Sequence, residues 1–328
     1  MKRIRSYIGL IALGLLGGLT LTELWVRGAR WMPPIQIIRG NCLRSIDGVP
    51  VWGCGNSPDD ARRHNRACVE AHPERLRILF FGSSITHGSG VTAQETFTTA
   101  LEARLNQRQP APGFCVLNFA EPGFQFEQKY AVARTEIARY RPALIVWESW
   151  WEWREFRVIG DAAYAVSGYR LRPDGFIGVA GVPGWLNNFL FLHSRLYEHV
   201  ALRYGERDTE GPAEREAMTA FVDTQLIKVV QSARSAGARL ASFRAPPLDR
   251  SFAETVASPS LSDTVLLEFS EAQRVPLYSL ARELIDQDYL QLRLDPCCHF
   301  NAAGHRALVP VMERIVLEQL GGAPARDD

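Results

Sequence analysis

Residues 77–90 read Arg77-Ile-Leu-Phe-Phe-Gly-Ser-Ser-Ile-Thr-His-Gly-Ser-Gly90. The apolar run from Ile78 to Phe81 is typical of a strand that is covered on both faces in a parallel sheet. Gly82 predicts a tight turn at the carboxyl end of that strand, where open α/β sheets bind their ligands. Ser84 stands on this turn and is a candidate nucleophile, provided that a base reaches it.

The chain that follows alternates between strand-like and helix-like patterns. We expect further strands at residues 114–119, 142–147, 238–243 and 275–278. We expect helices at residues 93–107, 124–140, 185–203, 212–236 and 301–320. Strands that alternate with helices predict a parallel sheet with helices on both faces, and Thr92 with Glu95 predicts a capping box where the first helix begins.

Residues 1–26 are interpreted as a targeting segment. Basic residues at the start precede an uncharged, mostly apolar run from Tyr7 to Thr22. With the apolar residues up to Val26, this run approaches the ~20 residues that span a bilayer. The basic start favours a cytoplasmic N-terminus, so we expect a membrane anchor with the rest of the chain on the periplasmic side. A cleaved signal peptide is the alternative, but no small-x-small cleavage site follows the run.

Residues 27–75 are expected to form a linker and an irregular, cysteine-containing lead-in, and residues 321–328 a disordered tail. The 6 cysteines fit an exported chain in which at least one disulfide forms. Cys297 and Cys298 either pair with each other or reach back to the lead-in, while Cys115 is expected to be a buried thiol. No Cys-x-x-Cys pair points to zinc, so neither a metal nor a cofactor is expected. The net charge of +1 gives no sign of nucleic-acid binding.

A base for Ser84 is offered near the end of the chain, in the segment Leu294-Asp-Pro-Cys-Cys-His-Phe-Asn-Ala-Ala-Gly304. Asp295 and His299 precede the last expected helix. A serine nucleophile needs an imidazole that takes its proton and an acid that orients the ring. Gly123 follows the second expected strand, and its backbone N–H is a candidate to join that of Ser84 in an oxyanion hole. The alternative is a glycine needed only for its turn.

These segments resemble the SGNH hydrolases, also called the GDSL esterase/lipase family. Gly82-Ser-Ser-Ile85 corresponds to the Gly-Asp-Ser-Leu block, Gly123 to the second-block glycine, and the segment from Asp295 to Gly304 to the last block. The resemblance spans residues 76–320 and implies an α/β fold, a flavodoxin-like three-layer α/β/α sandwich with a parallel sheet. It further implies a triad of Ser84, His299 and Asp295, and ester hydrolysis or acyl transfer without a metal.

Two positions depart from the pattern of that family. Its third block, Gly-x-Asn-Asp, is replaced by Trp147-Glu-Ser-Trp-Trp-Glu-Trp153, which lacks the Asn whose amide completes the oxyanion hole. An indole N–H of Trp150 or Trp151 would substitute, or two backbone donors would suffice. Asp295 stands four residues before His299 rather than three. It reaches the ring through a bulged loop, or else Ser84 and His299 act as a dyad.

The tryptophans of this segment are predicted to bind substrate, because aromatic rings at strand ends stack on sugars or hold acyl chains. They are Trp150, Trp151 and Trp153. We therefore expect a serine esterase acting on O-acetyl groups of an envelope glycan, or on another acyl or lipid ester. Acetyl transfer between sugars would use the same residues. The alternative is a non-catalytic carbohydrate- or ligand-binding or assembly protein on the same fold, which the two departures favour.

Overall fold

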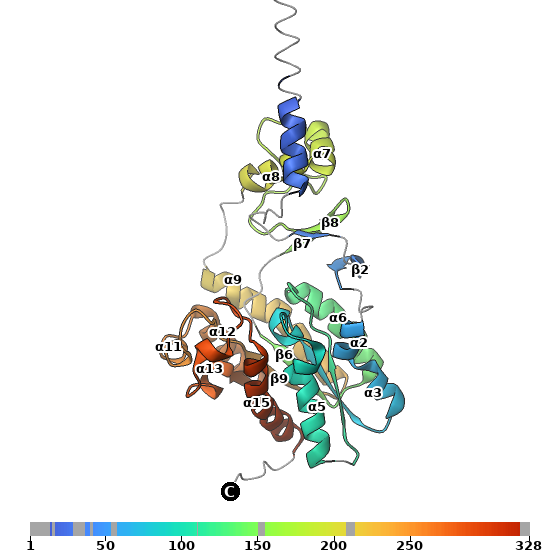
Figure 1. Cartoon of the computed structure of the whole chain (residues 1–328), viewed down its shortest axis with the longest axis vertical. Helices are drawn as coiled ribbons and strands as arrows, with labels where there is room; N and C mark the ends of the chain where they lie inside the picture. Colours follow the sequence, from blue (N-terminus) through green and yellow to red (C-terminus); the bar gives the residue numbers. More distant parts are fainter. Residues whose placement is uncertain are drawn as a thin grey trace, which may run out of the picture. The chain divides into compact units, whose positions relative to one another are not determined.

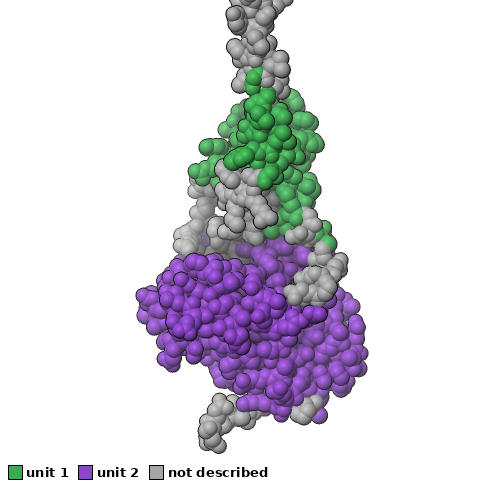
Figure 2. Space-filling model, viewed as in Figure 1, with its two compact units in different colours: residues 1–43, 154–211 green, residues 44–153, 212–328 purple. Residues whose placement is uncertain are grey.

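The protein is described by a computed structural model over residues 14, 17–28, 37–39, 42–53, 58–109, 111–149, 155–207 and 214–321. The chain forms two compact units, one of residues 1–43 with 154–211 and one of residues 44–153 with 212–328 (Figure 2). The larger unit holds the expected α/β domain. The domain expected at residues 76–320 is therefore interrupted after the third strand, and the lead-in from residue 44 onward belongs to the α/β unit.

The α/β unit is built on five parallel strands in the order β10-β9-β6-β4-β5. Their bounds are Leu76–Phe81 for β4, Phe114–Asn118 for β5, Leu144–Glu148 for β6, Arg239–Arg244 for β9 and Leu277–Ser279 for β10. Numbered along the chain, the order is the flavodoxin-like 2-1-3-4-5, which reverses direction between β4 and β6. All five strands expected from the sequence are present, and the expected sandwich of parallel sheet and helices is confirmed.

One face of the sheet is covered by α5 (Phe97–Arg108), α13 (Leu280–Glu283) and α15 (Ala302–Leu320). Phe80 and Val146 point from the sheet into this layer, where they join Leu101 and Met312 in one buried cluster. The expected capping box of Thr92 and Glu95 is formed, but it begins a short 3-10 turn, Ala93–Glu95. The helix proper starts one turn later, because the side chain of Thr96 accepts the N–H of Thr99.

The other face of the sheet packs against α6 (Phe126–Tyr140), α10 (Ile227–Ser235) and α12 (Leu261–Gln273) (Figure 1). Trp147 points into this layer and contacts Phe81 and Phe126, with ring centroids 6.1 Å and 5.8 Å away. The helix expected at residues 212–236 is divided in the structure. It consists of α9 (Glu214–Phe221), a π-helical turn (Val222–Leu226) and α10.

The lead-in is more regular than the sequence suggested. It contains the hairpin of β2 (Arg44–Ile46) and β3 (Val49–Val51), followed by α2 (Pro58–His64) and α3 (Arg66–Ala71). The connection from β9 to β10 carries α11 (Phe252–Ala257), and the chain beyond β10 carries α14 (Tyr289–Leu292). These short helices were not expected, because none has enough length to show a periodic apolar pattern.

Disulfides join two pairs of cysteines within this unit. Cys68 of α3 bonds to Cys115 of β5, and Cys297 bonds to its neighbour Cys298. The expectation that Cys115 is a free buried thiol is therefore wrong. Its side chain leaves the strand toward α3, with the Cα atoms of the pair 5.8 Å apart. Cys42 is also disulfide-bonded.

The smaller unit has its own core. A helix over residues 17–28 is joined by an antiparallel sheet in the order β1-β8-β7 and by two helices. Their bounds are Ile37–Arg39 for β1, Phe156–Ile159 for β7, Ala162–Ala165 for β8, Gly184–His193 for α7 and Arg195–Tyr204 for α8. The single helix expected at residues 185–203 is broken at Ser194, whose backbone is extended and whose side chain caps α8.

Within the described part of the chain, no helix has both the length and the apolar character needed to cross a bilayer. Most of the anchor expected at residues 1–26 lies outside the described residues, which in this segment are residue 14 and residues 17–26. The anchor therefore stays a prediction. The tail expected at 321–328 lies outside the described residues from 322 onward.

Candidate active site

The candidate nucleophile, Ser84, is the first residue of the short helix α4 (Ser84–His87), which follows the end of β4. Its hydroxyl Oγ lies 2.8 Å from Nε2 of His299, although 215 residues of chain separate the two. Nδ1 of the same ring lies 2.5 Å from Oδ2 of Asp295. The structure thus brings together the three side chains that the sequence analysis grouped, at the strand ends where the order of the sheet reverses.

The two contacts fit one tautomer of a neutral imidazole. An ionised carboxylate only accepts, so the ring donates Nδ1–H to Asp295 and keeps the Nε2 lone pair for the Ser84 hydroxyl. Partial burial disfavours the charge on Asp295. The hydrogen bonds from the His299 ring and from the N–H groups of Cys298 and His299 outweigh it, and the pKa of Asp295 falls to about 2. This is the arrangement in which a histidine acts as general base toward a serine.

The loop between Asp295 and His299 accommodates the extra residue noted in the sequence. Oδ1 of Asp295 accepts the backbone N–H groups of Cys297, Cys298 and His299 at 3.0, 3.1 and 3.3 Å. The loop therefore curls around one carboxylate oxygen and leaves the other for the imidazole. The Cys297–Cys298 disulfide lies inside this curl. The four-residue spacing is thus compatible with a Ser-His-Asp arrangement.

Asn301 anchors the loop to the final helix, as expected of an N-cap. Its Oδ1 accepts the N–H groups of Ala303 and Gly304 at 2.9 and 3.0 Å, and its Nδ2 donates to the carbonyl of Gln291 at 2.8 Å. On the opposite side, Leu294 fills the space beside Gly90, where a Cβ would stand 2.1 Å from Leu294 Cδ2. Gly90 also has a φ of 89°. The loop carrying the serine and the loop carrying the histidine meet at this close contact.

Glu148, the last residue of β6, was not identified from the sequence as part of the site. Its side chain is completely buried and accepts hydrogen bonds from the turn that carries Ser84. Oε2 accepts the N–H groups of Ser83 and Thr86 at 3.2 and 3.0 Å and the Thr86 hydroxyl at 2.5 Å, while Oε1 accepts the Ser83 hydroxyl. A Cβ at Gly82 would stand 2.3 Å from Thr86 Oγ1 and 2.6 Å from Oε2, so only glycine leaves room for Thr86 and this carboxylate together. The signal in the sequence was an acid ending an apolar strand.

Two further polar side chains, one at the end of a neighbouring strand and one on a helix, hold the same turn. Asn118, at the end of β5, donates to the Thr86 carbonyl at 2.7 Å. Arg63 of α2 donates to the carbonyls of His87 and Val91, the latter at 2.7 Å. From the sequence, Arg63 is expected in a small basic patch, residues 62–66, that is solvated or contacts lipid headgroups. For Arg63 this expectation is wrong, because the side chain is buried and its guanidinium donates to backbone carbonyls.

The remaining predicted site residues are less fully described. Gly123 lies in the turn between β5 and α6 with a φ of 80°, and the N–H of Ser84 is one of the first in its helix, which α-helical bonding does not use. Their joint role as an oxyanion hole stays a prediction. Trp150, Trp151 and Trp153 lie outside the described residues.

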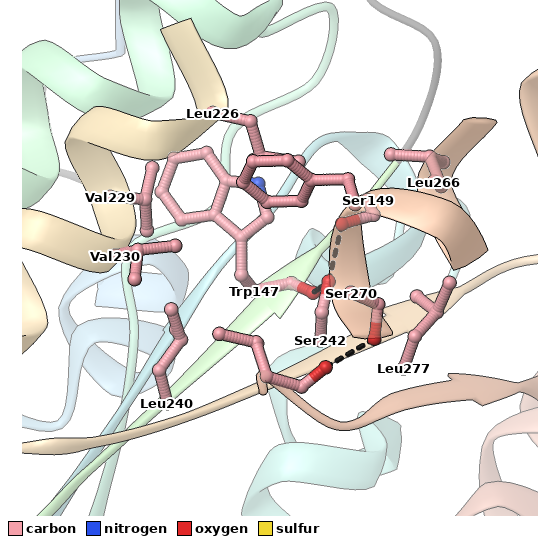
Figure 3. Close-up of a pocket in the computed structure, with 12 residues that line it drawn as sticks. Trp147, Ser149, Leu226, Val229, Val230, Leu240, Ser242, Leu266, Ser270 and Leu277 are labelled. Carbon is pink, nitrogen blue, oxygen red and sulfur yellow. Dashed lines mark hydrogen bonds between the residues drawn. The ribbon is translucent and has the colours of Figure 1, made fainter. Parts of the chain in front are cut away.

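A cavity of about 20 Å³ lies on the side of the sheet covered by α10 and α12, between Trp147, Val230 and Leu266 (Figure 3). At its edge the hydroxyls of Ser149 and Ser242 hydrogen-bond to each other, and Ser242 donates to the Trp147 carbonyl at 3.1 Å. The volume suits about one water molecule. None of the triad side chains lines it, so we regard it as a packing gap rather than as a place for substrate.

One group among the described residues has the composition of a metal site, namely Cys68, Glu102 and Cys115. The two cysteines are bonded to each other. The carboxylate of Glu102 accepts the N–H of Val116 at 2.7 Å and the amide of Asn65 at 2.5 Å. Burial raises the pKa of Glu102. In this state the group supplies no thiolate, so it serves the fold rather than a metal.

No protein-family model matches the chain, and no curated protein is similar to it in sequence. Solved structures of similar shape include the acetyl xylan esterase AlAXEase, at 12% identity and a TM-score of 0.44, over 74% of this chain and 100% of that one. TesA is similar at 14% identity and a TM-score of 0.43, over 75% and 99%. A member of the lipolytic G-D-S-L family from Veillonella parvula DSM 2008 is similar at 12% and 0.40, over 74% and 97%. Each TM-score is below 0.5, so these similarities carry no argument about the function of this chain.

Proposed function

We propose that the protein is a serine ester hydrolase of the SGNH type. The single observation that carries the proposal is the continuous hydrogen-bonded path from Ser84 Oγ through the imidazole of His299 to Asp295, at 2.8 and 2.5 Å. Ser84 Oγ attacks the ester carbonyl while His299 Nε2 takes its proton, and Asp295 stabilises the imidazolium that forms. His299 then gives the proton to the departing alcohol. A water molecule releases the acyl group by the same steps, with His299 again as the base.

The oxyanion of the tetrahedral intermediate is held by the backbone N–H groups of Ser84 and Gly123. The third-block Asn is missing from this chain, and removal of one such donor costs about 10²–10³ in rate in well-studied hydrolases. We therefore propose slow turnover of simple esters, unless an indole N–H of Trp150 or Trp151 replaces the amide. Slow turnover would leave the acylation of Ser84 itself readily detectable.

The proposed substrate is an O-acetyl group on an envelope glycan, with a lipid or other acyl ester as the next choice. Support comes from the tryptophans that follow β6, because β6 ends at the same edge of the sheet as the strand before Ser84. Support also comes from the basic and apolar N-terminal segment, which would hold the enzyme at the membrane on the periplasmic side. Acetyl transfer needs only a sugar hydroxyl in place of the attacking water, on the same residues.

A fluorophosphonate probe tests the proposal, since it forms a covalent bond only with an activated serine. We expect labelling of the wild type and of Ser89→Ala, which removes a neighbouring hydroxyl outside the triad, and none of Ser84→Ala. Release of nitrophenol from p-nitrophenyl acetate should follow the same pattern. A folded wild-type chain that takes up no probe would instead support the non-catalytic binding protein.

The products of the reaction distinguish the three possible reactions, namely glycan deacetylation, lipid ester hydrolysis and acetyl transfer. Acetate released from an O-acetylated polysaccharide supports the glycan esterase, whereas fatty acid released from a long-chain ester supports the lipid choice. An O-acetylated acceptor sugar formed without free acetate would identify the reaction as transfer. Each assay is compared with Ser84→Ala, so that background hydrolysis is subtracted.

A further inference from the structure

The helix α7 of the smaller unit carries large apolar side chains on its exposed side, while Phe191 on its other side is buried in the core of the unit. Its buried positions include Asn187, which is fully enclosed and donates to the Ile177 carbonyl while accepting the hydroxyl of Tyr197. Its exposed positions are Trp185, Phe189 and Leu192, with 75%, 56% and 43% of their surfaces accessible. The spacing of four and then three residues places these three on one face.

This apolar face is fixed beside the helix of residues 17–28. Glu23 accepts the hydroxyl of Ser194 and the N–H groups of Arg195 and Leu196 at 2.8, 2.8 and 2.9 Å. Arg27 pairs with Glu23 at 2.7 Å and donates to the carbonyl of His193, the last residue of α7, at 2.8 Å. The one acid in the segment 1–26 thus holds the end of α7 and the start of α8. Figure 1 shows the helix of residues 17–28 beside α7 and α8.

The helix of residues 17–28 is itself apolar on its outer side. Leu21, Leu24 and Trp25 have 69%, 60% and 59% of their surfaces accessible. This helix continues directly from the uncharged run that begins at Tyr7. Soluble surfaces rarely display contiguous apolar side chains of this size, whereas tryptophan is enriched where a bilayer meets water.

We propose that the exposed face of α7 lies in the headgroup region of a phospholipid bilayer, so that the insertion of residues 155–207 makes a second membrane contact beside the N-terminal segment. The occupant is lipid rather than a second copy of the chain. The same unit contains the apolar run from Tyr7 to Thr22, which we expect to insert into a bilayer. Hydrogen bonds of Glu23 and Arg27 connect the end of that run to the end of α7. A short helix with Trp, Phe and Leu on one face is the usual form of an interfacial contact.

Photocrosslinking from α7 tests the proposal on the full chain. Benzoylphenylalanine replaces Phe189, Trp185 or, as the matched control on the α/β unit, Leu267, which is 49% accessible. The chain is reconstituted in vesicles of phosphatidylethanolamine and phosphatidylglycerol that contain a traceable alkyne phospholipid. Fluorophosphonate labelling of Ser84, or the melting curve where labelling is absent, checks that each variant is folded.

We expect lipid adducts from positions 189 and 185 in several-fold excess over position 267. Equal yields at all three positions would overturn the proposal, as would a chain that does not float with the vesicles. An adduct between two copies of the chain at position 189, in place of lipid, would assign the face to self-association and would overturn it as well. These outcomes are independent of whether Ser84 hydrolyses an ester.

Discussion

Glu148 accepts two hydrogen bonds from Thr86, one from the backbone N–H and one from the hydroxyl of Thr86. These bonds join the end of β6 to the turn that carries Ser84. The carboxylate is completely buried, as is Thr86, while its other partner, Ser83, is half-buried. Its function in this position is to fix the direction in which the Ser84 side chain leaves the sheet. Because Glu148 acts through the turn and does not contact the hydroxyl itself, we regard it as a positioning residue.

Two replacements of Glu148 should have different effects on stability and on kcat. Glu148→Ala leaves two buried donors of Thr86 and two half-buried donors of Ser83 without their acceptor, and we expect a loss of about 3 kcal/mol in the free energy of unfolding. Glu148→Gln keeps one acceptor oxygen, so we expect a smaller loss of stability and a clear fall in kcat with little change in KM. Urea unfolding and steady-state kinetics measure the two effects. Glu155→Gln, on an exposed glutamate, is the control, and equal kcat for both Gln variants would contradict the positioning role.

Asp295→Asn should lower kcat by about 10³–10⁴ with little effect on KM, because an amide stabilises the wrong tautomer of His299 and cannot balance the imidazolium. Kinetics with p-nitrophenyl acetate test this, with Ser84→Ala giving the baseline. A fall of less than tenfold would indicate that Ser84 and His299 work as a dyad.

The pKa of Asp295, at about 2, gives a second prediction for the same carboxyl. Its folded pKa lies below the ordinary value of 3.8, so the charged form stabilises the fold above that value. This contribution is lost as the pH falls from about 4 toward 2. The difference in unfolding free energy between wild type and Asp295→Asn should therefore shrink over that window, as urea titrations would reveal. A difference that stays constant from pH 7 to pH 2 would show that the folded state does not favour the ion.

His305, in the first turns of α15, should make the fold sensitive to mild acid. Burial disfavours its charged form, nearby Arg63 adds to the effect and Glu95 opposes it, so the pKa of His305 falls to about 4. The ring stacks on Phe97 at 5.8 Å and is 1% exposed. Since the unfolded chain binds the proton near pH 6.5, stability is full above that pH and is lost as the pH falls toward 4. A shift of this size corresponds to roughly 3 kcal/mol.

Chemical unfolding at pH 7, 5.5 and 4 measures this loss. The comparison variant is His305→Gln, which does not titrate and should be less stable at pH 7 but flatter with pH. Parallel curves for the two proteins would assign the acid sensitivity to other groups.

Removal of the Cys297–Cys298 disulfide should mainly lower kcat, whereas removal of the Cys68–Cys115 disulfide should mainly lower stability. Cys297→Ser with Cys298→Ser loosens the loop that brings Asp295 to His299, and a displacement of about 1 Å there can cost up to ~10² in rate. We expect a fall in kcat with a small change in melting temperature. Cys68→Ser with Cys115→Ser, the matched control, should cost about 2–4 kcal/mol of stability and leave kcat unchanged. Identical kinetic effects from both double variants would show that the loop does not depend on its bridge.

Much of the α/β unit followed from local sequence patterns. The apolar runs before Gly82, Asn118 and Glu148 predicted three strands. The candidate site was predicted from Ser84, Gly123 and the segment from Asp295 to His299, which follow one another in the order typical of the family. Such features are predictable because they depend on residues that are close in the sequence, or on the fact that the carboxyl ends of parallel strands lie at the same edge of a sheet. The break at Ser194 was missed because apolar residues recur at helical spacing on both sides of His193-Ser-Arg195, so the pattern reads as one helix.

The long-range polar contacts could not be predicted in the same way. Glu148 looked like one of several acids among tryptophans, and Arg63 like one of several arginines on a short helix. Their burial depends on which carbonyls and N–H groups the folded turn leaves unpaired, and that is known only once β4, β5 and β6 are side by side. The pairing of Cys115 with Cys68 is a consequence of the same register.

Gly82 and Glu148 occupy one space between them, and this has a consequence for how such a sequence can change over time. A methyl group at position 82 would stand 2.3 Å from Thr86 Oγ1 and 2.6 Å from Glu148 Oε2, so it fits only if Thr86 moves or is replaced and the acid at 148 has been shortened or lost. Shortening the acid is tolerable only if the turn has found another acceptor. Substitutions at the two sites should therefore show strong epistasis, and a deep mutational scan of the pair would find that neither position drifts alone.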